Sequence, residues 1–171
     1  MKQMMNCLSF AVVVAVCMRA DEISAQMPAI AAPGQTVVAT LHAEGAQVYE
    51  CKAGTDGKLT WQIREPIATL FLDGKTIGRH YAGPTWEHTD GSLVVGKVVG
   101  MVFGATPNDI PWLRLEVADR RGSGILSCVM TVQRINTKGG TAQGPCDNTG
   151  TYLTVPTVPY SAEYVFLGKG A

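Results

Sequence analysis

The stretch GRHYAGPTWEHTDGS, residues 78–92, contains two turn signals separated by a short run of strand-forming residues. Asp90-Gly91 is a dipeptide typical of tight β-hairpins, and Gly83-Pro84 supplies a second turn. Further Asp-Gly pairs begin at Asp56 and Asp73, so the three pairs follow one another at intervals of 17 residues. This interval fits two strands and two turns, and it predicts an antiparallel meander.

Alternation of apolar and polar residues predicts strands on both sides of this stretch. Leu113, Leu115 and Val117 alternate with polar residues, and the same pattern places Trp61 in the core. No segment shows a helical period. We expect strands at about 36–42, 47–52, 58–64, 68–72, 75–81, 85–89, 92–103, 112–118, 125–135 and 159–167. The predicted fold is all-β: a single-domain antiparallel β-sandwich or flattened barrel of about ten strands, rich in meanders, with little or no helix.

The N-terminus resembles a secretory signal peptide. Lys2 precedes an uncharged apolar run, Leu8–Met18, and Ala25 ends an acceptable cleavage site. The run is shorter than the ~20 apolar residues that span a bilayer, and no such run follows it. Val16 disfavours lipid attachment at Cys17, because such sites require a small residue there. We expect a signal peptide at 1–25, a lead-in at 26–35, and one β domain at 36–171 that is secreted or periplasmic, with no transmembrane segment after signal removal.

Three of the five cysteines lie outside the signal peptide, in a compartment where disulfides form. Alternation over Ile125–Ile135 places Cys128 on an apolar strand face, where a free thiol behaves as a small hydrophobe. The remaining two cysteines then predict a disulfide between Cys51 and Cys146, worth a few kcal/mol.

The meander also predicts which residues meet at one end of the sheet. Because alternate turns of a meander share an end, all three Asp-Gly turns are expected together. The opposite end, here called the proline rim, comprises the connections at 42–46, 65–66, 82–84, 105–111 and 136–146. Binding groups concentrate on such loops. The candidate ligand-binding residues are His80, Tyr81, Trp86, Glu87, Asp109, Trp112 and Asn136, although Trp86 and Trp112 could equally fill the core at the end of the sandwich.

Composition and motif spacing exclude several functions. Fourteen basic residues balance fourteen acidic ones, so no basic stripe for nucleic acid or anionic membrane is expected. His42, Glu44 and His88 could in principle join the rim residues as metal ligands, but the chain has no H-x-H or HExxH spacing, and we expect no metal and no cofactor.

Arg134, on an otherwise apolar strand face, is expected to pair with Glu87 or Asp109.

Several longer segments resemble the domain of unknown function family numbered 3455. They are QVYEC at 47–51, IGRHYAGPTWEHTDGS at 77–92, DIPWLRLEV at 109–117, VQRINTKGG at 132–140 and VPYSAEYVF at 158–166. The resemblance implies secretion and a β-rich domain, but no mechanism. Some members carry a malate dehydrogenase label. Gly122-Ser123-Gly124 lacks the third glycine and the following helix of a dinucleotide site, so we predict that this chain is not an NAD-dependent malate dehydrogenase.

These observations favour a non-catalytic ligand-binding or surface-interaction module. Its partner would be a small molecule, a glycan or a protein, and the aromatic residues at the rim suit any of these. The alternative is a hydrolase that uses a carboxylate and a histidine at the same rim, although no catalytic residue can be named. A structural envelope protein is the third possibility.

Overall fold

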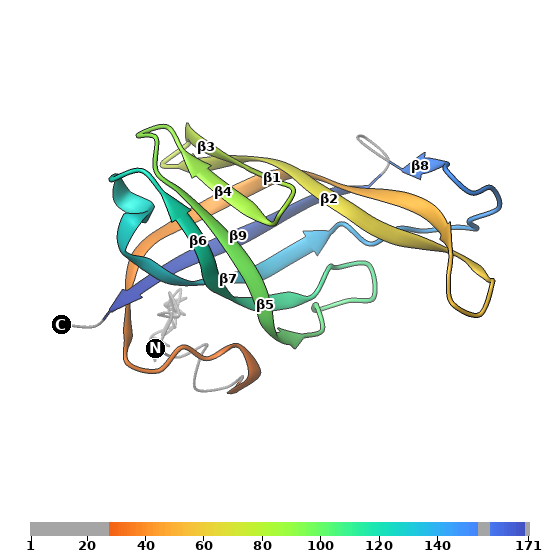
Figure 1. Ribbon diagram of the computed structural model, residues 1–171, viewed down its shortest axis with the longest axis horizontal. Helices are drawn as coiled ribbons and strands as arrows, with labels where there is room; N and C mark the ends of the chain where they lie inside the picture. The colour runs from red at the N-terminus through yellow and green to blue at the C-terminus, as the bar shows by residue number, and fades with distance from the viewer. Residues whose placement is uncertain (1–27, 154–157, 170–171) are drawn as a thin grey trace, which may run out of the picture.

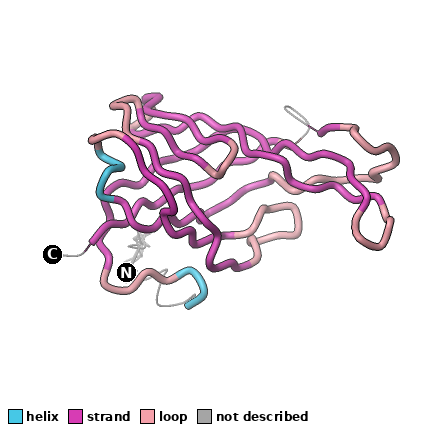
Figure 2. The backbone as a smooth tube through the Cα atoms, in the orientation of Figure 1, coloured by secondary structure: helices cyan, strands magenta, loops and turns pink. Residues whose placement is uncertain are grey.

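The computed structural model describes residues 28–153 and 158–169, which form one antiparallel sheet of nine strands (Figure 1). The strands are β1 (Gln35–Ala53), β2 (Leu59–Leu72), β3 (Lys75–Tyr81), β4 (Thr85–His88), β5 (Leu93–Val102), β6 (Trp112–Arg121), β7 (Val129–Gly139), β8 (Tyr152–Leu153) and β9 (Pro159–Lys169). Two short 3-10 turns, η1 (Pro28–Ile30) and η2 (Ile125–Cys128), are the helical elements in Figure 2. The predicted all-β fold is confirmed.

The sheet closes on itself because β1 pairs along both of its edges. The strand order is β2-β3-β4-β5-β6-β7-β9-β1-β8, and a further pairing joins β1 to β2. Residues 35–46 of β1 pair with β9, and residues 42–53 pair with β2. Closure requires a close approach at Gly45, where an added Cβ would meet the Ile67 carbonyl oxygen and Ala68. The result is a ring with one interior, in agreement with the predicted flattened barrel.

Two of the predicted turns are absent, because the chain continues straight through 42–46 and 65–66 as parts of β1 and β2. Pro66 is tolerated within a strand because the pairing of β2 with β3 stops at Ala68, which leaves β2 an edge there. The prediction that all three Asp-Gly turns share one end is therefore wrong. The turns at Asp73 and Asp90 share an end, whereas the turn at Asp56 lies at the opposite end, with the connections at 82–84 and 105–111. The name proline rim is kept for this opposite end. His42 and Glu44 lie within β1.

The Asp73-Gly74 turn shows why this dipeptide marks a hairpin. Asp73 has φ 49° and Gly74 has φ 73°. Two successive residues with positive φ form the type I′ turn, whose twist matches that of paired strands. The hairpin between β2 and β3 follows from these two residues.

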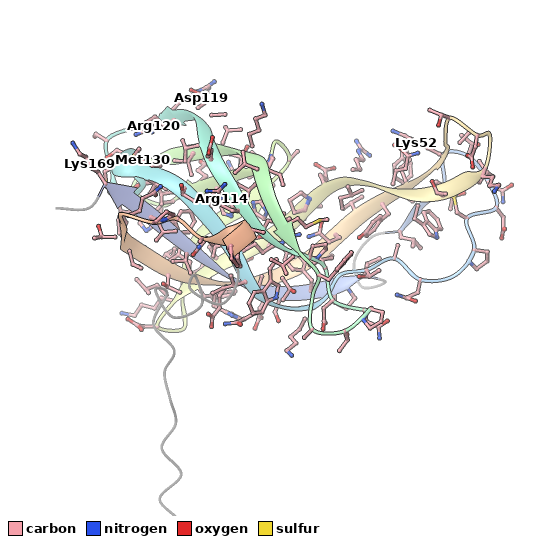
Figure 3. All side chains as sticks on the ribbon, turned by 90° about the horizontal axis from the view of Figure 1, so that it is seen from below. Lys52, Arg114, Asp119, Arg120, Met130 and Lys169 are labelled. Carbon is pink, nitrogen blue, oxygen red and sulfur yellow. A yellow bond between two sulfur atoms is a disulfide. The ribbon has the colours of Figure 1, made fainter. Side chains whose placement is uncertain are left out.

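Two apolar clusters stabilise the ring, one inside it and one on its outer face. The inner cluster includes Leu41, Leu70, Trp86, Leu115, Tyr164 and Phe166. The outer cluster joins Ile30 of η1 to Ile135, Val165 and Trp112. Arg114, labelled in Figure 3 beside the N-terminal segment, donates from Nη1 to the Ala31 carbonyl oxygen at 3.1 Å. The N-terminal segment is thus part of the packed domain.

The prediction that Cys128 is buried on a strand face is wrong. Residues 125–128 form the 3-10 turn η2, so regular alternation begins only at Val129. Cys128 is exposed and Met130 is 45 % exposed, whereas Val129 is fully buried. Trp61 also differs from the prediction. It is half-buried, and its indole nitrogen donates to the Gly144 carbonyl oxygen at 3.2 Å.

The predicted disulfide between Cys51 and Cys146 is confirmed, with the two Cα atoms 5.6 Å apart. It fixes the segment after β7 against the far part of β1, beyond the end of the β1–β9 pairing. The short strand β8 pairs with Tyr49 and Glu50 beside it. In the described part of the chain, no helix has the length and apolar character needed to cross a membrane.

Replacing both Cys51 and Cys146 with serine should lower the free energy of unfolding by about 2 to 5 kcal/mol, because the crosslink restrains the unfolded chain over a separation of 95 residues. Urea unfolding without reductant measures this loss. The matched control is Cys128→Ser, an exposed position where the change should stay within about 0.5 kcal/mol. Equal effects of the two changes would contradict this assignment.

Candidate functional site

A cavity of about 440 Å³ opens at the proline rim, and every side of the ring contributes to it. Its wall is largely apolar, with a few polar side chains among the apolar ones. The lining residues are Gln47, Tyr49, Ile63, Arg64, Glu65, Pro66, His80, Gly83, Pro84, Trp86, Val98, Ile110, Pro111, Leu113, Leu115, Arg134 and Tyr164. A concave, largely apolar space with a few polar groups is the usual form of a small-molecule site.

The cavity is open because neighbouring strands differ in length. β3 and β4 stop at the turn Ala82-Gly83-Pro84, and Ala68 of β2 pairs with His80 near the end of β3. β1 and β2 continue well beyond this level, as Figure 1 shows. The cavity is therefore open on the side of the turn, where β3 and β4 have already ended. Gly83 is needed in that turn because its φ is 127°.

Three aromatic rings form the floor of the cavity. The His80 ring stacks on Trp86 with ring centroids 4.5 Å apart and an interplanar angle of 8°. Tyr164 from β9 packs edge-on against both, at 4.9 Å from His80 and 5.3 Å from Trp86. These three rings join β3 and β4 to β9 across the interior of the ring. The same contacts that stabilise the core therefore position the cavity floor.

His80 is neutral in the folded protein. Burial lowers its pKa to about 3, although the hydrogen bond to Thr85 acts in the opposite direction and the charge of Arg134 lowers it further. Its Nδ1 lies 2.8 Å from the Thr85 carbonyl oxygen, which can only accept, so Nδ1 carries the proton. Nε2 is then an acceptor. A neutral, stacked histidine of this kind serves as part of a wall.

Arg134 brings a positive charge into the cavity from β7. Its Nε and Nη2 donate to the Pro111 carbonyl oxygen at 3.0 and 2.9 Å. The predicted pairing with Glu87 or Asp109 is wrong, and within the described residues Arg134 takes part in no ion pair. Arg134 faces inward because it shares the phase of Val132, which is buried in the inner cluster.

Two further lining residues carry N–H groups without a partner among the described residues. They are Gln47, at Nε2, and Trp86, at Nε1, and their side chains are 3 % and 1 % exposed. A buried donor without an acceptor costs free energy, so such groups are uncommon in proteins. The nearby Tyr49 hydroxyl, in contrast, donates to the Gly140 carbonyl oxygen at 2.9 Å.

The structure brings two of the seven predicted ligand-binding residues, His80 and Trp86, to the cavity. Tyr81 and Glu87 lie instead on the outer surface. Glu87 Oε2 accepts hydrogen bonds from Arg79 Nη2 at 2.8 Å and from the Tyr81 hydroxyl at 2.9 Å. The bond from Arg79 is the main reason that the pKa of Glu87 is lowered. Glu87 and His80 therefore lie on opposite faces of the β3–β4 hairpin.

The other three predicted residues have separate roles around the rim. Asp109 accepts from the Gly139 amide at 2.7 Å and from the Thr106 hydroxyl at 2.8 Å, which lowers its pKa. Trp112 packs in the outer apolar cluster. Asn136, with φ 51°, is exposed and donates to Glu163 at 3.0 Å. Asp109 and Asn136 thus order the rim, and Trp112 helps to hold the N-terminal segment.

Gln47, Tyr49 and Arg134 are cavity residues that sequence reasoning did not place in the site. Alternation along each strand could have identified them, because it tells which residues face the interior. Gln47 and Tyr49 continue the inward-facing series of Leu41 and Ala43, and they would be identified as polar interruptions of it. That series was missed because a turn was expected at 42–46.

The described residues contain no group of three or more His, Cys, Asp or Glu side chains arranged to hold a metal ion. Asp90 and His88 interact at 3.1 Å within the β4–β5 turn. Asp90 also accepts from the Ser92 hydroxyl and the Ile125 amide, and the first of these bonds is the main cause of its lowered pKa. Asp90 thereby ties η2 to the turn.

Comparison with known protein families identifies the family of this chain. A family model described as "Protein of unknown function (DUF3455)" matches residues 32–168. The chain belongs to this family. The match covers the ring from the N-terminal segment to β9, which includes every cavity residue of this DUF3455 protein. No curated protein and no solved structure matches the chain.

Replacing His80 with phenylalanine tests whether the buried ring is neutral. The unfolded chain binds a proton at this residue near pH 6.5, but the folded protein does so only near pH 3, so the native state loses stability as pH falls between these values. His80→Phe removes this loss. The stability advantage of the wild type over the variant should shrink by about 2 kcal/mol between pH 6 and pH 4. Urea unfolding at both pH values measures it, and an advantage that stays constant would contradict the assignment.

Proposed function

We propose that this protein is a secreted or periplasmic binding protein whose cavity takes up a small apolar molecule without transforming it. The cavity itself is the observation that carries the proposal. It has a volume of about 440 Å³, and its wall is mainly apolar. Cavities of about 300 to 1,000 Å³ with such walls are typical of ligand sites.

The apolar groups at the opening support the same conclusion. Ile63 and Val98 line the cavity, yet they are 55 % and 49 % exposed. Exposed apolar side chains beside an apolar cavity extend the surface that a ligand can cover. Burial of this surface by a ligand would be favourable, at about 25 cal/mol per Å² of apolar area.

The disulfide and the N-terminal sequence both support a secreted or periplasmic location. The Cys51–Cys146 disulfide is typical of an oxidising environment, outside the cell or in the periplasm. The predicted signal peptide at 1–25 agrees with it, although it lies outside the described residues. A pocket in a secreted domain suits the capture of a molecule from the surroundings.

The hydrolase alternative receives less support from the geometry. A carboxylate and a histidine that act together must lie within hydrogen-bonding reach of one substrate. His80 lies in the interior with its Nδ1 bonded to Thr85, whereas Glu87 is held by Arg79 on the outer face. Glu65, the carboxylate of the cavity lining, is paired with Arg64 at 3.6 Å. Binding without chemistry therefore accounts for the site better.

The neutral fluorophore N-phenyl-1-naphthylamine should bind saturably, with one molecule per chain, because its two aromatic groups suit an apolar cavity. Isothermal titration calorimetry gives the stoichiometry and affinity. Val98→Trp places a large side chain in the cavity wall and should weaken binding at least tenfold.

Val99→Trp is the matched control. Val99 is the next residue in the same strand and is 38 % exposed, but the cavity lining does not include it. The affinity of this variant should stay within about twofold of the wild type. Absence of saturable binding, or equal weakening by both substitutions, would rule out the cavity as a binding site.

A further inference from the structure

We infer that the cavity ligand is an amphipathic acid, with an apolar body and one oxyanion head group that binds Arg134. This inference rests on the proposed function and specifies the chemical class of its ligand. It follows from the hydrogen-bond donors and charges of the lining. A purely apolar molecule would leave these groups without partners.

Arg134 has donor capacity to spare. A guanidinium carries five N–H groups, and those at Nε and Nη2 that point to the Pro111 carbonyl oxygen account for two of them. Arg134 also lies beside Tyr164, where its charge helps to lower the pKa of this tyrosine against the larger effect of burial. The guanidinium therefore retains N–H groups for a ligand. Oxyanions match its planar geometry, often with two parallel hydrogen bonds.

The neighbouring unpaired groups also favour an acceptor. Gln47 Nε2 and Trp86 Nε1 are both donors, and both belong to side chains that line the cavity. A ligand oxygen that reaches them would remove the cost of leaving them buried without a partner. The side chains that carry these donors line the same cavity as Arg134.

The balance of charge in the lining points to a monoanion. Arg64 and Glu65 lie 3.6 Å apart and offset each other, and His80 is neutral. Among the charged lining residues this leaves the positive charge of Arg134. A cation that is partly removed from water is stabilised by one anionic partner, and a carboxylate supplies this together with two acceptor oxygens.

The two ends of the cavity differ in the way that an amphipathic molecule requires. Arg134 lies beside Tyr164, which is part of the aromatic floor. Ile63 and Val98, both exposed and apolar, lie at the opening. An acid can therefore place its head group at Arg134 while its apolar part extends towards these two side chains.

Three probes with the same alkyl chain separate head-group recognition from apolar binding. Decanoate, decan-1-ol and decyltrimethylammonium are each titrated against the complex of the intact protein with N-phenyl-1-naphthylamine, below the concentrations at which they aggregate. The affinity of decanoate, measured from displacement of the fluorophore, should be at least tenfold higher than that of decan-1-ol. Decyltrimethylammonium should have the lowest affinity of the three.

Two variants identify the donors. Arg134→Met keeps an apolar stem of similar length and should reduce decanoate to the affinity of decan-1-ol, with the affinity of decan-1-ol unchanged within about twofold. Gln47→Leu removes a buried donor that has no partner, so the fold should tolerate it. It should weaken decanoate several-fold and leave decan-1-ol unaffected. Val99→Trp again serves as the control for structural side effects.

Each result decides between the two proposals. If the fluorophore does not bind at all, the proposed function fails. If the fluorophore binds but decanoate and decan-1-ol displace it equally, or the ammonium compound displaces it best, the binding function stands and the acid inference is overturned. Equal loss of decanoate and decan-1-ol affinity in both Arg134→Met and Gln47→Leu would also overturn it.

Discussion

The structure depends on β1 being paired along both of its edges. Residues 42–46 of this strand have β2 on one side and β9 on the other, and Gly45 allows the close approach that this requires. Closure removes most of the free edges that an antiparallel sheet would expose. It also places every inward-facing side chain in one interior, so the packed core and the cavity share the same space.

The shared interior explains the division of the ring into a packed end and a hollow end. Near the Asp73 and Asp90 turns the interior is filled by aliphatic and aromatic side chains of the inner cluster. Towards the proline rim, β3 and β4 stop while β1 and β2 continue, and the filling residues run out. The His80, Trp86 and Tyr164 rings form the boundary. Arg134 can occupy an inward position because it lies where the cavity admits solvent or a ligand.

Local patterns in the sequence predicted the all-β fold, most strand positions and the hairpins at Asp73 and Asp90, since these follow from turn chemistry and alternation. The Cys51–Cys146 disulfide was also predicted correctly, although the reason for leaving out Cys128, its burial on a strand face, is wrong. The straight passage of β1 through 42–46 depends on partners far along the chain, so a local Gly in a polar setting was interpreted as a turn. The same limit applies to the site. His80 and Trp86 were identified by residue type, whereas Gln47 and Arg134 line the cavity because of the side of the ring that they face.

The proposed ligand site lies inside the ring, between Trp86 and Arg134. The three tryptophans, Trp61, Trp86 and Trp112, give separate indole N–H signals in a ¹H–¹⁵N spectrum, which can be assigned with single Trp→Phe variants. Decanoate should shift the Trp86 indole and the Arg134 Nε signals, while the Trp112 indole on the outer face keeps its position. Shifts confined to Trp112, or to surface residues away from the cavity, would contradict this account.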